Sequence, residues 1–410
     1  MKQLKAWAIN VSLMLSSLGL GVGLSEVGLR LAQIEGLPKK LQQHSEFSPA
    51  FYMMSDPERG WQNRPNAKGW QRKEGEAYIQ INSEGLRDTP NGTRRDRNYP
   101  KVKPENTFRI AVLGDSFTFA AQVPIEQTYT SILEENLTTC KAFNGKNIEV
   151  INFGVEGYGT AQELLTLRQR VWDYQPDLVL LAFYIGNDVI DNSKALENNH
   201  YRPFFVYKNG ELVPDYSFRD LGLEYSDRYL ITLADRFPAW LVNHSRILQV
   251  AKKAELELKK RNAVQHFNTV TAQVFQSPTD KKWQEAWQIT DDLIVMMQEE
   301  VIEKNSDFLL IAIADPIQVH PDEKEREAYQ IALDVKDYDY PDKRLKELSE
   351  NHNIPILSLT QLFLSYGKDN QTCLHGFENS GLCTGHWNPQ GHQLAAQLIN
   401  QKLCQTYSKQ

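Results

Sequence analysis

A glycine and two polar residues follow a short apolar run early in the chain, and the types of the polar pair suit nucleophilic catalysis. The run at 109–113 reads as a buried strand, and Gly114, Asp115 and Ser116 come directly after it. In open α/β sheets, the residues that bind ligands and carry out catalysis lie beyond the carboxyl ends of such strands. Ser116 is therefore the candidate nucleophile, with Asp115 as a supporting residue. An ordinary turn is the alternative interpretation of Gly-Asp-Ser taken alone.

Further polar residues follow two more apolar runs and precede the last helix. The run at 148–152 leads into a glycine-rich turn at 153–159, and the run at 178–184 leads into Asn187. His386 lies near the C-terminus. A serine hydroxyl needs a nearby imidazole to take its proton, and the oxyanion that develops needs donors already aimed at it. These stretches supply both kinds of group.

The order Gly-Asp-Ser, Gly, Gly-Asn-Asp, His resembles that of the SGNH (GDSL-type) hydrolase family. The resemblance implies that Ser116 is the nucleophile and that His386 is the base. It also implies an oxyanion hole formed by the backbone N–H groups of Ser116 and Gly157 and the side-chain amide of Asn187. Gly157 is preferred to Gly154 because its spacing from the preceding strand matches the family pattern.

One departure from the family pattern concerns the acid that orients the histidine. The family usually carries an aspartate two or three residues before the histidine, but Thr384 and Cys383 occupy these positions here. The third triad member is therefore unknown, with Glu378 as the candidate, Asp369 as a second acid and a backbone carbonyl as a further possibility. The sequence thus predicts a slow enzyme with a dyad of Ser116 and His386.

Two other histidines are weaker candidates for the base. His392 lies on the last helix, for which the sequence predicts Asn388 as N-cap and Pro389 as first residue, and His375 lies upstream. A purely structural role for His386, or an inactive site, is the alternative to a working base.

The composition is that of an ordinary globular protein. The chain has 410 residues, of which 41% are hydrophobic and 24% charged, enough for one large α/β domain with insertions or for two domains. A net charge of −7 gives no basic surface for nucleic acid, so no nucleic-acid partner is expected. The resemblance implies neither a metal nor a cofactor.

Five apolar runs alternate with helical patterns between residues 105 and 410. This alternation predicts a parallel, doubly wound sheet in the flavodoxin-like order, which is also the fold that the resemblance implies. A long interruption at 191–281 is predicted to be an insertion after the third strand, beginning with a hairpin at Asn209-Gly210. Because it emerges beside the expected site, we interpret it as a possible lid.

Residues 1–33 are predicted to form a transmembrane signal anchor. Lys2 and Lys5 precede an uncharged stretch from Ala6 to Ser25, about long enough to cross a bilayer. The positive flank predicts a cytoplasmic N-terminus and a catalytic domain on the extracytoplasmic side. A cleaved signal peptide is the alternative.

Residues 34–104 are predicted to form a turn-rich extension with a β-hairpin. The stretch 78–82 alternates partly between apolar and polar residues, as a half-exposed strand does. The segment 82–88, Asn-Ser-Glu-Gly-Leu-Arg-Asp, resembles one found in a membrane-anchored subgroup of SGNH proteins. We expect a hairpin packed on the domain edge, and Arg87 lining the substrate entrance is the alternative.

The four cysteines allow three pairings in an oxidising compartment. Cys373 with Cys383 is the favoured local pair, and such a bridge would rigidify the loop that delivers His386. Four free thiols are the alternative.

These features together predict a membrane-anchored, extracytoplasmic serine esterase. Its substrate would be an acyl ester, with a short acyl group on a glycan or a lipid as the candidate. An O-acyltransferase that uses the same serine is one alternative. A catalytically silent binding module, suggested by the missing acid, is the other.

Overall fold

The chain divides into two compact units, which are described separately. One unit comprises Met1–Ser45 and Ser226–Phe267, and the other comprises Glu46–Tyr225 and Asn268–Gln410. The computed structural model describes residues 2–31, 52–87, 99–221, 241, 245–251, 254 and 271–409. All of the residues that the sequence proposes for catalysis lie in the second, larger unit.

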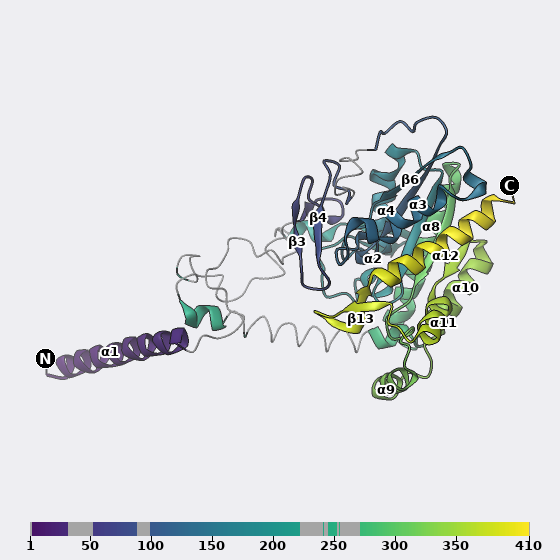
Figure 1. Cartoon of the computed structure of the whole chain (residues 1–410). Coiled ribbons are helices and arrows are strands. Elements are labelled where there is room, and N and C mark those ends of the chain that lie inside the picture. Colours follow the sequence, from purple (N-terminus) through teal and green to yellow (C-terminus); the bar gives the residue numbers. More distant parts are fainter. Residues whose placement is uncertain are drawn as a thin grey trace. The chain divides into compact units, whose positions relative to one another are not determined.

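A sheet of five parallel strands forms the centre of the larger unit (Figure 1). Its strands are β5 (Thr107–Gly114), β6 (Asn147–Asn152), β7 (Leu178–Tyr184), β10 (Asp307–Ile313) and β11 (Ile356–Ser358). They lie in the order β11-β10-β7-β5-β6. Counted along the chain from β5, this is the flavodoxin-like order 2-1-3-4-5. The predicted doubly wound parallel sheet is therefore confirmed.

Helices cover both faces of this sheet (Figure 1). One face packs against α3 (Tyr129–Leu137), α11 (Thr360–Asn370) and α12 (Pro389–Tyr407), and the other against α4 (Thr160–Gln169), α8 (Lys281–Glu303) and α10 (Tyr340–His352). In β5, Ala111 and Leu113 join the core beneath α4 and α8, whereas Ile110 and Val112 join the opposite core. Successive side chains of a strand point to opposite faces, so a strand covered on both faces is apolar almost throughout.

Short helices complete the larger unit. They are α2 (Ser116–Phe119), η2 (Ile125–Gln127), η3 (Lys141–Phe143), η4 (Val171–Tyr174), α5 (Asp188–Asp191), η5 (Ser217–Leu221) and α9 (Glu323–Leu333). Both α2 and α5 begin directly after or close to the carboxyl end of a central strand, which places polar residues at that edge of the sheet.

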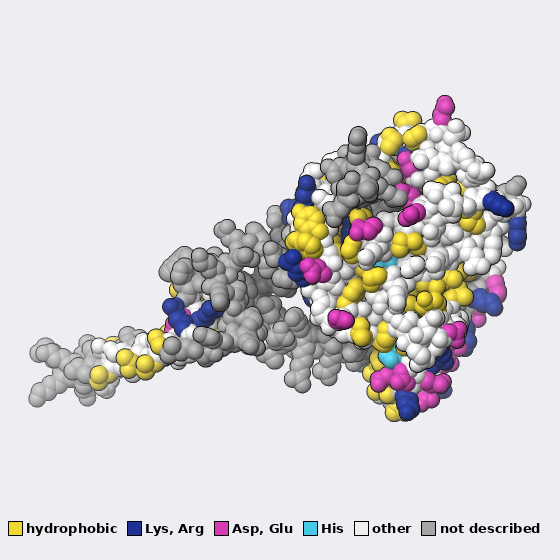
Figure 2. Space-filling view, in the orientation of Figure 1, with side chains coloured by type: hydrophobic (Ala, Val, Ile, Leu, Met, Phe, Trp, Pro, Cys, Tyr) yellow, Lys and Arg dark blue, Asp and Glu magenta, His cyan; other side chains and the backbone are white. Residues whose placement is uncertain are grey.

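The N-terminal extension consists of two antiparallel hairpins. In the first, β1 (Met53–Asp56) pairs with β2 (Gly60–Asn63), and in the second, β3 (Lys68–Gln71) pairs with β4 (Ala77–Gln80). Ala77 and Ile79 of β4 are buried in a small core with Phe119 and Val155, whereas Tyr78 between them is 37% exposed. The half-exposed strand expected at 78–82 is therefore β4. Hydrophobic, basic and acidic side chains lie side by side on the surface of this hairpin in Figure 2.

Arg87 is a buried structural cation, so the alternative that it lines a substrate entrance is wrong. Its side chain is only 1% exposed, and the guanidinium donates hydrogen bonds to the carbonyls of Phe119, Ala120 and Val123, where α2 ends. Burial lowers the pKa of Arg87 to about 9. Arg87 thereby ties the extension to the short helix that begins with Ser116. Residue 88, the last of the predicted segment, lies outside the described residues.

The beginning of the predicted insertion forms a hairpin. In it, β8 (Phe204–Lys208) and β9 (Glu211–Asp215) pair across the turn at Asn209-Gly210, as expected. Phe204 and Phe205 are buried. Most of the rest of the insertion, 222–240, 242–244, 252–253 and 255–270, lies outside the described residues. The proposed role as a lid therefore stays a prediction.

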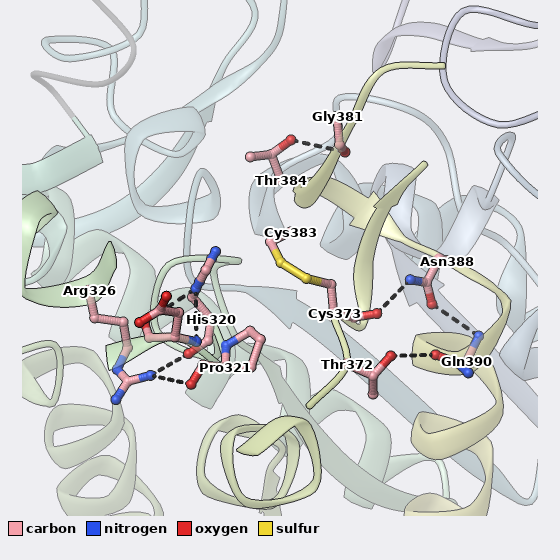
Figure 3. Close-up of a disulfide and its surroundings, with 11 residues drawn as sticks. His320, Pro321, Arg326, Thr372, Cys373, Gly381, Cys383, Thr384, Asn388 and Gln390 are labelled. Carbon is pink, nitrogen blue, oxygen red and sulfur yellow. Dashed lines mark hydrogen bonds between the residues drawn. A yellow bond between two sulfur atoms is a disulfide. The ribbon is translucent and has the colours of Figure 1, made fainter. Parts of the chain in front are cut away.

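The segment that delivers His386 is a β-hairpin that the sequence did not predict. It comprises β12 (His375–Phe377) and β13 (Gly381–Trp387), which pair antiparallel. The disulfide Cys373–Cys383 ties β13 to the segment just before β12, as Figure 3 shows, and a second disulfide joins Cys140 to Cys404. The favoured local pairing is confirmed, and the alternative of four free thiols is wrong.

The predicted cap of the last helix is confirmed. The Asn388 side chain accepts the N–H groups of Gln390 at 3.0 Å and Gly391 at 3.1 Å, at the start of α12. Its amide nitrogen donates to the Cys373 carbonyl at 2.7 Å (Figure 3). Asn388 therefore links the helix to the disulfide-bonded segment in front of it.

The smaller unit contains one long N-terminal helix, α1 (Lys2–Leu31). Its segment Ser12–Arg30 has a mean hydropathy of 1.4 and is long and apolar enough to cross a membrane, a test that a signal sequence also passes. In the same unit, Glu26 of α1 accepts the backbone N–H groups of Arg246 at 2.8 Å and Ile247 at 3.1 Å.

Candidate active site

Ser116 lies at the carboxyl end of β5, as the first residue of α2. Asp115 is the N-cap of this helix, and its Oδ1 accepts the N–H of Phe117 at 2.8 Å. Its Oδ2 lies 3.4 Å from the Ser116 hydroxyl. Burial raises the pKa of Asp115 to about 6, although the hydrogen bond from Phe117 acts in the opposite direction. Asp115 thus holds the turn from which Ser116 projects.

A chain of hydrogen bonds joins Ser116 to His386 and His386 to Glu74. His386 Nε2 lies 2.8 Å from Ser116 Oγ, and His386 Nδ1 lies 2.6 Å from Glu74 Oε2. The second carboxylate oxygen, Glu74 Oε1, accepts the backbone N–H of His386 at 2.8 Å. Glu74 therefore binds the same residue twice, which fixes both the ring and the tautomer that carries its proton on Nδ1. This is the geometry of a serine–histidine–acid triad.

The acid is the part of the site that the sequence analysis missed. The carboxylate on His386 belongs to Glu74, so Glu378 and Asp369 were the wrong candidates. The predicted dyad is also wrong, because the second ring nitrogen has a carboxylate partner. Glu74 precedes His386 by 312 positions and comes from the turn between β3 and β4. No local spacing rule connects residues so far apart in the chain.

The turn that carries Glu74 is attached to the hairpin that carries His386. Asn379, in the turn between β12 and β13, accepts the N–H of Gly75 at 2.9 Å and donates to the carbonyls of Gly75 at 2.9 Å and Arg72 at 3.2 Å. Asn379 is the residue after Glu378. The segment chosen from the sequence therefore does support the acid, but through the neighbour of the residue that was proposed.

Gly385 permits the close approach of Glu74 to His386. Its φ is +70°, and a Cβ atom there would lie 2.1 Å from Glu74 Oε1. Any side chain at 385 would therefore push the carboxylate away from the histidine.

The pKa values of the pair move as expected for an acid that supports a base. Burial opposes ionisation of Glu74, but the hydrogen bonds and charge of His386 outweigh it and lower the pKa of the carboxyl. Burial likewise favours a neutral His386, but the hydrogen bond and charge of Glu74 raise the pKa of the ring above its usual value. Glu74 is thus placed to stabilise the imidazolium that forms when His386 takes a proton.

The other two candidate histidines are core residues. His375 is buried beside Trp387 and Phe117, and His392 is buried with Nδ1 facing the backbone N–H of Tyr129 at 3.3 Å. Burial lowers the pKa of each to about 3. Neither is part of the hydrogen-bonded chain at Ser116.

The glycine-rich turn after β6 lies against α2. The N–H of Gly154 is taken by Asn152 Oδ1 at 2.8 Å, and a Cβ at Gly154 would lie 2.5 Å from the backbone nitrogen of Phe119. Gly157 has a φ of +74°, and within the part of the chain that the structure describes its N–H has no hydrogen-bond partner. These observations favour Gly157 over Gly154 as the oxyanion donor.

Asn187 lies at the carboxyl end of β7, as the N-cap residue of α5. One hydrogen of its side-chain amide is donated to Asp191 Oδ2 at 3.0 Å. The Asn187 side chain also acts to lower the pKa of the buried Asp115 carboxyl, against the larger effect of burial. The ends of β6, β5 and β7, which are adjacent in the sheet, therefore bring the three predicted oxyanion groups to one edge.

The sheet order and the contact of Ser116 with His386 are those that the resemblance to the SGNH family implies, whereas the acid on His386 is Glu74 and not a residue just before the histidine. No protein-family model matches the chain. An arylesterase from Vibrio mimicus is 36% identical over 73 residues, which is 18% of this chain and 34% of that protein. The chain thus matches about a third of the length of this relative.

Similar solved structures are named as esterases or acylhydrolases. One is an acetyl xylan esterase with a TM-score of 0.37 and 15% identity, covering 72% of this chain and all of the other chain. A second is a lipase/acylhydrolase from Enterococcus faecalis with a TM-score of 0.36 and 16% identity, covering 73% of this chain and 97% of the other. A third is an acetylxylan esterase from Geobacillus stearothermophilus, a catalytic mutant, with a TM-score of 0.37 and 12% identity, covering 72% and 94%.

Proposed function

We propose that this protein is a carboxylic ester hydrolase that works through an acyl-enzyme on Ser116. The observation that carries the proposal is the continuous hydrogen-bonded chain from Ser116 Oγ through His386 to Glu74, with 2.8 Å and 2.6 Å at its two links. Such a chain activates a serine hydroxyl that is otherwise a weak nucleophile.

In the first half of the proposed reaction, Ser116 Oγ attacks the carbonyl carbon of the ester. His386 Nε2 takes the hydroxyl proton, and Glu74 stabilises the imidazolium through Nδ1–H. The carbonyl oxygen becomes an oxyanion, for which the donors are the backbone N–H groups of Ser116 and Gly157 and the amide of Asn187. Collapse of this intermediate breaks the ester C–O bond, and His386 passes its proton to the departing alcohol.

In the second half, a water molecule replaces the alcohol. His386 takes a proton from the water as it attacks the acyl-enzyme, the same donors stabilise the second oxyanion, and the proton returns to Ser116 as the carboxylic acid leaves. If an acceptor alcohol replaced the water, the same residues would carry out acyl transfer. The two activities therefore differ only in what reaches the acyl-enzyme.

The substrate proposed is a short acyl ester on a glycan or a lipid. Two of the similar structures are named as acetylxylan esterases and one as a lipase/acylhydrolase, which supports these two substrate types as the first to test. The hypothesis of a silent binding module loses its motivation, because it rested on the missing acid and Glu74 fills that position.

We further propose that α1 anchors the enzyme in a membrane with the catalytic unit on the extracytoplasmic side. Support comes from the apolar segment Ser12–Arg30 and from the two disulfides, which persist in oxidising compartments. Retention in membranes after alkaline carbonate washing, together with an intact N-terminus by mass spectrometry, would be expected. A soluble form that begins near Leu24 would instead show a cleaved signal peptide.

Labelling of the purified protein with a fluorophosphonate tests the catalytic proposal. The probe should modify Ser116, as mapped by peptide mass spectrometry, and the labelled protein should no longer hydrolyse p-nitrophenyl acetate. Addition of a polyol acceptor during hydrolysis distinguishes the transferase, which would form the acylated polyol. Absence of both labelling and ester hydrolysis would contradict the proposed function.

A further inference from the structure

The peptide between Glu156 and Gly157 carries a contact that no part of the proposed mechanism uses. Trp61, on β2 of the N-terminal extension, donates its indole Nε1–H to the Glu156 carbonyl at 2.9 Å. The Trp61 side chain is only 1% exposed. The Glu156 carbonyl belongs to the same peptide group as the Gly157 N–H, which is the proposed oxyanion donor.

The planarity of the peptide links the Trp61 contact on the Glu156 carbonyl to the direction of the Gly157 N–H. In a planar trans peptide the C=O and the N–H point to opposite sides, so a hydrogen bond that holds the carbonyl also aims the N–H. Gly157 has a φ of +74°, and glycine adopts positive and negative φ about equally readily. The backbone at Gly157 therefore does not by itself prevent this peptide from reversing, and a second group must select the orientation.

A buried arginine binds the carbonyl of the next peptide group, between Gly157 and Tyr158, and packs against the Trp61 ring. Arg202 donates to the Gly157 carbonyl at 3.0 Å, and its guanidinium lies 5.1 Å from the centre of the Trp61 ring. Arg202 also pairs at 3.2 Å with Asp191, which accepts the amide of Asn187. Trp61 thus belongs to a buried group of side chains that reaches both the Gly157 and the Asn187 donors.

We propose that Trp61 is a positioning residue that keeps the Gly157 N–H directed into the oxyanion hole. The proposal rests on the proposed esterase function, since it assigns Trp61 a part in the same site. Without the indole N–H, the peptide is free to populate the reversed orientation, in which its carbonyl rather than its N–H faces the oxyanion. The loss is then specific to the transition state, because the ground-state ester needs no charged-oxygen donor.

The test compares Trp61→Phe with Tyr158→Phe. The phenylalanine at 61 keeps an aromatic ring but removes the donor to Glu156. Tyr158→Phe is the matched control, because the Tyr158 hydroxyl donates to the Trp61 backbone carbonyl and joins the same two segments without touching the Glu156–Gly157 peptide. Melting temperature, kcat, KM and the inhibition constant of a trifluoromethyl ketone, which forms an oxyanion on Ser116, are measured for both variants.

Trp61→Phe should lower kcat about 10- to 100-fold, below the roughly 10²–10³ that follows complete loss of one oxyanion donor. KM should stay near the wild-type value, and the ketone should bind more weakly in proportion to the loss in kcat/KM. Tyr158→Phe should lower the melting temperature but leave kcat and the ratio of ketone affinity to KM unchanged. Equal kinetic losses in the two variants, or wild-type kinetics in Trp61→Phe, would overturn the proposal.

Crystal structures of the two variants give a readout that does not depend on activity. The Glu156–Gly157 peptide should be reversed or mixed in Trp61→Phe and unchanged in Tyr158→Phe. A wild-type protein without esterase activity would refute the proposed function, whereas an unchanged peptide in Trp61→Phe would refute the role of Trp61. If Trp61→Phe does not fold, benzothienylalanine at position 61 keeps the shape of the indole without its N–H, and the same outcomes apply.

Discussion

Two of the regions that build the candidate site obtain their geometry in different ways, and the β12–β13 hairpin adds His386 to them. The central sheet contributes Ser116, Gly157 and Asn187, which follow three adjacent parallel strands. The N-terminal extension contributes Glu74 and Trp61, which lie on or between short antiparallel strands. The first group is held in place by the ladder of a fully covered sheet. The second group depends on side-chain contacts between segments that are far apart in sequence.

The extension needs this support because isolated two-stranded hairpins are only marginally stable in water. Here β4 packs Ala77 and Ile79 against Phe119 and Val155, which belong to the sheet region. Arg87 adds hydrogen bonds to carbonyls at the end of α2. The region that presents the nucleophile and the region that presents the acid therefore share one small core. The comparison teaches that the extension is a part of the site rather than a spacer before it.

The largest expected effect removes the nucleophile of the sheet region. Ser116→Ala should abolish hydrolysis of p-nitrophenyl acetate and labelling by a fluorophosphonate. The melting temperature should change little, because the hydroxyl contributes little packing. Full activity in this variant would end the esterase proposal and with it the comparison of the two regions.

The next largest effect is expected when the carboxylate of Glu74, in the extension, is replaced. Glu74→Gln should lower kcat about 10⁴-fold, the loss expected when the acid of a triad is replaced by its amide. Glutamine has only one acceptor oxygen, whereas Glu74 uses one oxygen for the Nδ1–H and the other for the backbone N–H of His386.

The matched control for Glu74→Gln is Glu378→Gln, which should leave kcat unchanged. Steady-state kinetics with one activated ester measure both variants. A strong loss in Glu378→Gln together with a mild one in Glu74→Gln would reverse the assignment of the acid.

The dependence of kcat/KM on pH tests the role of Glu74 in a second way. His386 accepts the Ser116 proton only when its ring is neutral, so kcat/KM should fall as the pH drops through the pKa of the ring. Glu74 raises that pKa, against the opposing effect of burial. Removal of the charge in Glu74→Gln should therefore move the acidic limb of the profile to lower pH. A limb that stays in place would mean that Glu74 does not act on the titrating group.

The smallest expected effect on activity concerns the disulfide in the hairpin that delivers His386. Replacement of Cys373 and Cys383 by serine should lower stability by up to about 3 kcal/mol, given the short loop that the bridge closes. It should also reduce kcat, though far less than Glu74→Gln, because β13 would hold His386 less firmly. Unfolding in urea and steady-state kinetics measure the two effects.

The other disulfide provides the control. Cys140 and Cys404 are separated by 264 positions and join parts of the core away from the triad. Their replacement by serine should lower stability at least as much, because the loop is longer, but should leave kcat unchanged for the folded protein. A larger loss of kcat here than at Cys373–Cys383 would contradict the special role of the His386 hairpin.

The sequence by itself determined the sheet and the residues that follow its strands. The apolar runs that end in Gly-Asp-Ser and Gly-Asn-Asp locate two of these strands directly. A parallel strand buried on both faces must be apolar, and the polar residues of the site must follow its carboxyl end. The cap at Asn388 was equally local, since an asparagine followed by proline marks a helix start. The short separation of Cys373 and Cys383 favoured their pairing without excluding free thiols, and the structure contains the disulfide.

The acid and the support for the oxyanion donor were decided only by the tertiary structure. Glu74 carries no sequence signal, since it lies in a turn 312 positions from His386 and is one of many acidic residues in the chain. Its selection depends on the contact of two hairpins through Asn379 and on the missing side chain at Gly385. The hydrogen bond from Trp61 to the Glu156 carbonyl likewise depends on the packing of two segments that are far apart in the sequence. Such contacts arise from the packing of distant segments, and no periodicity within either segment encodes them.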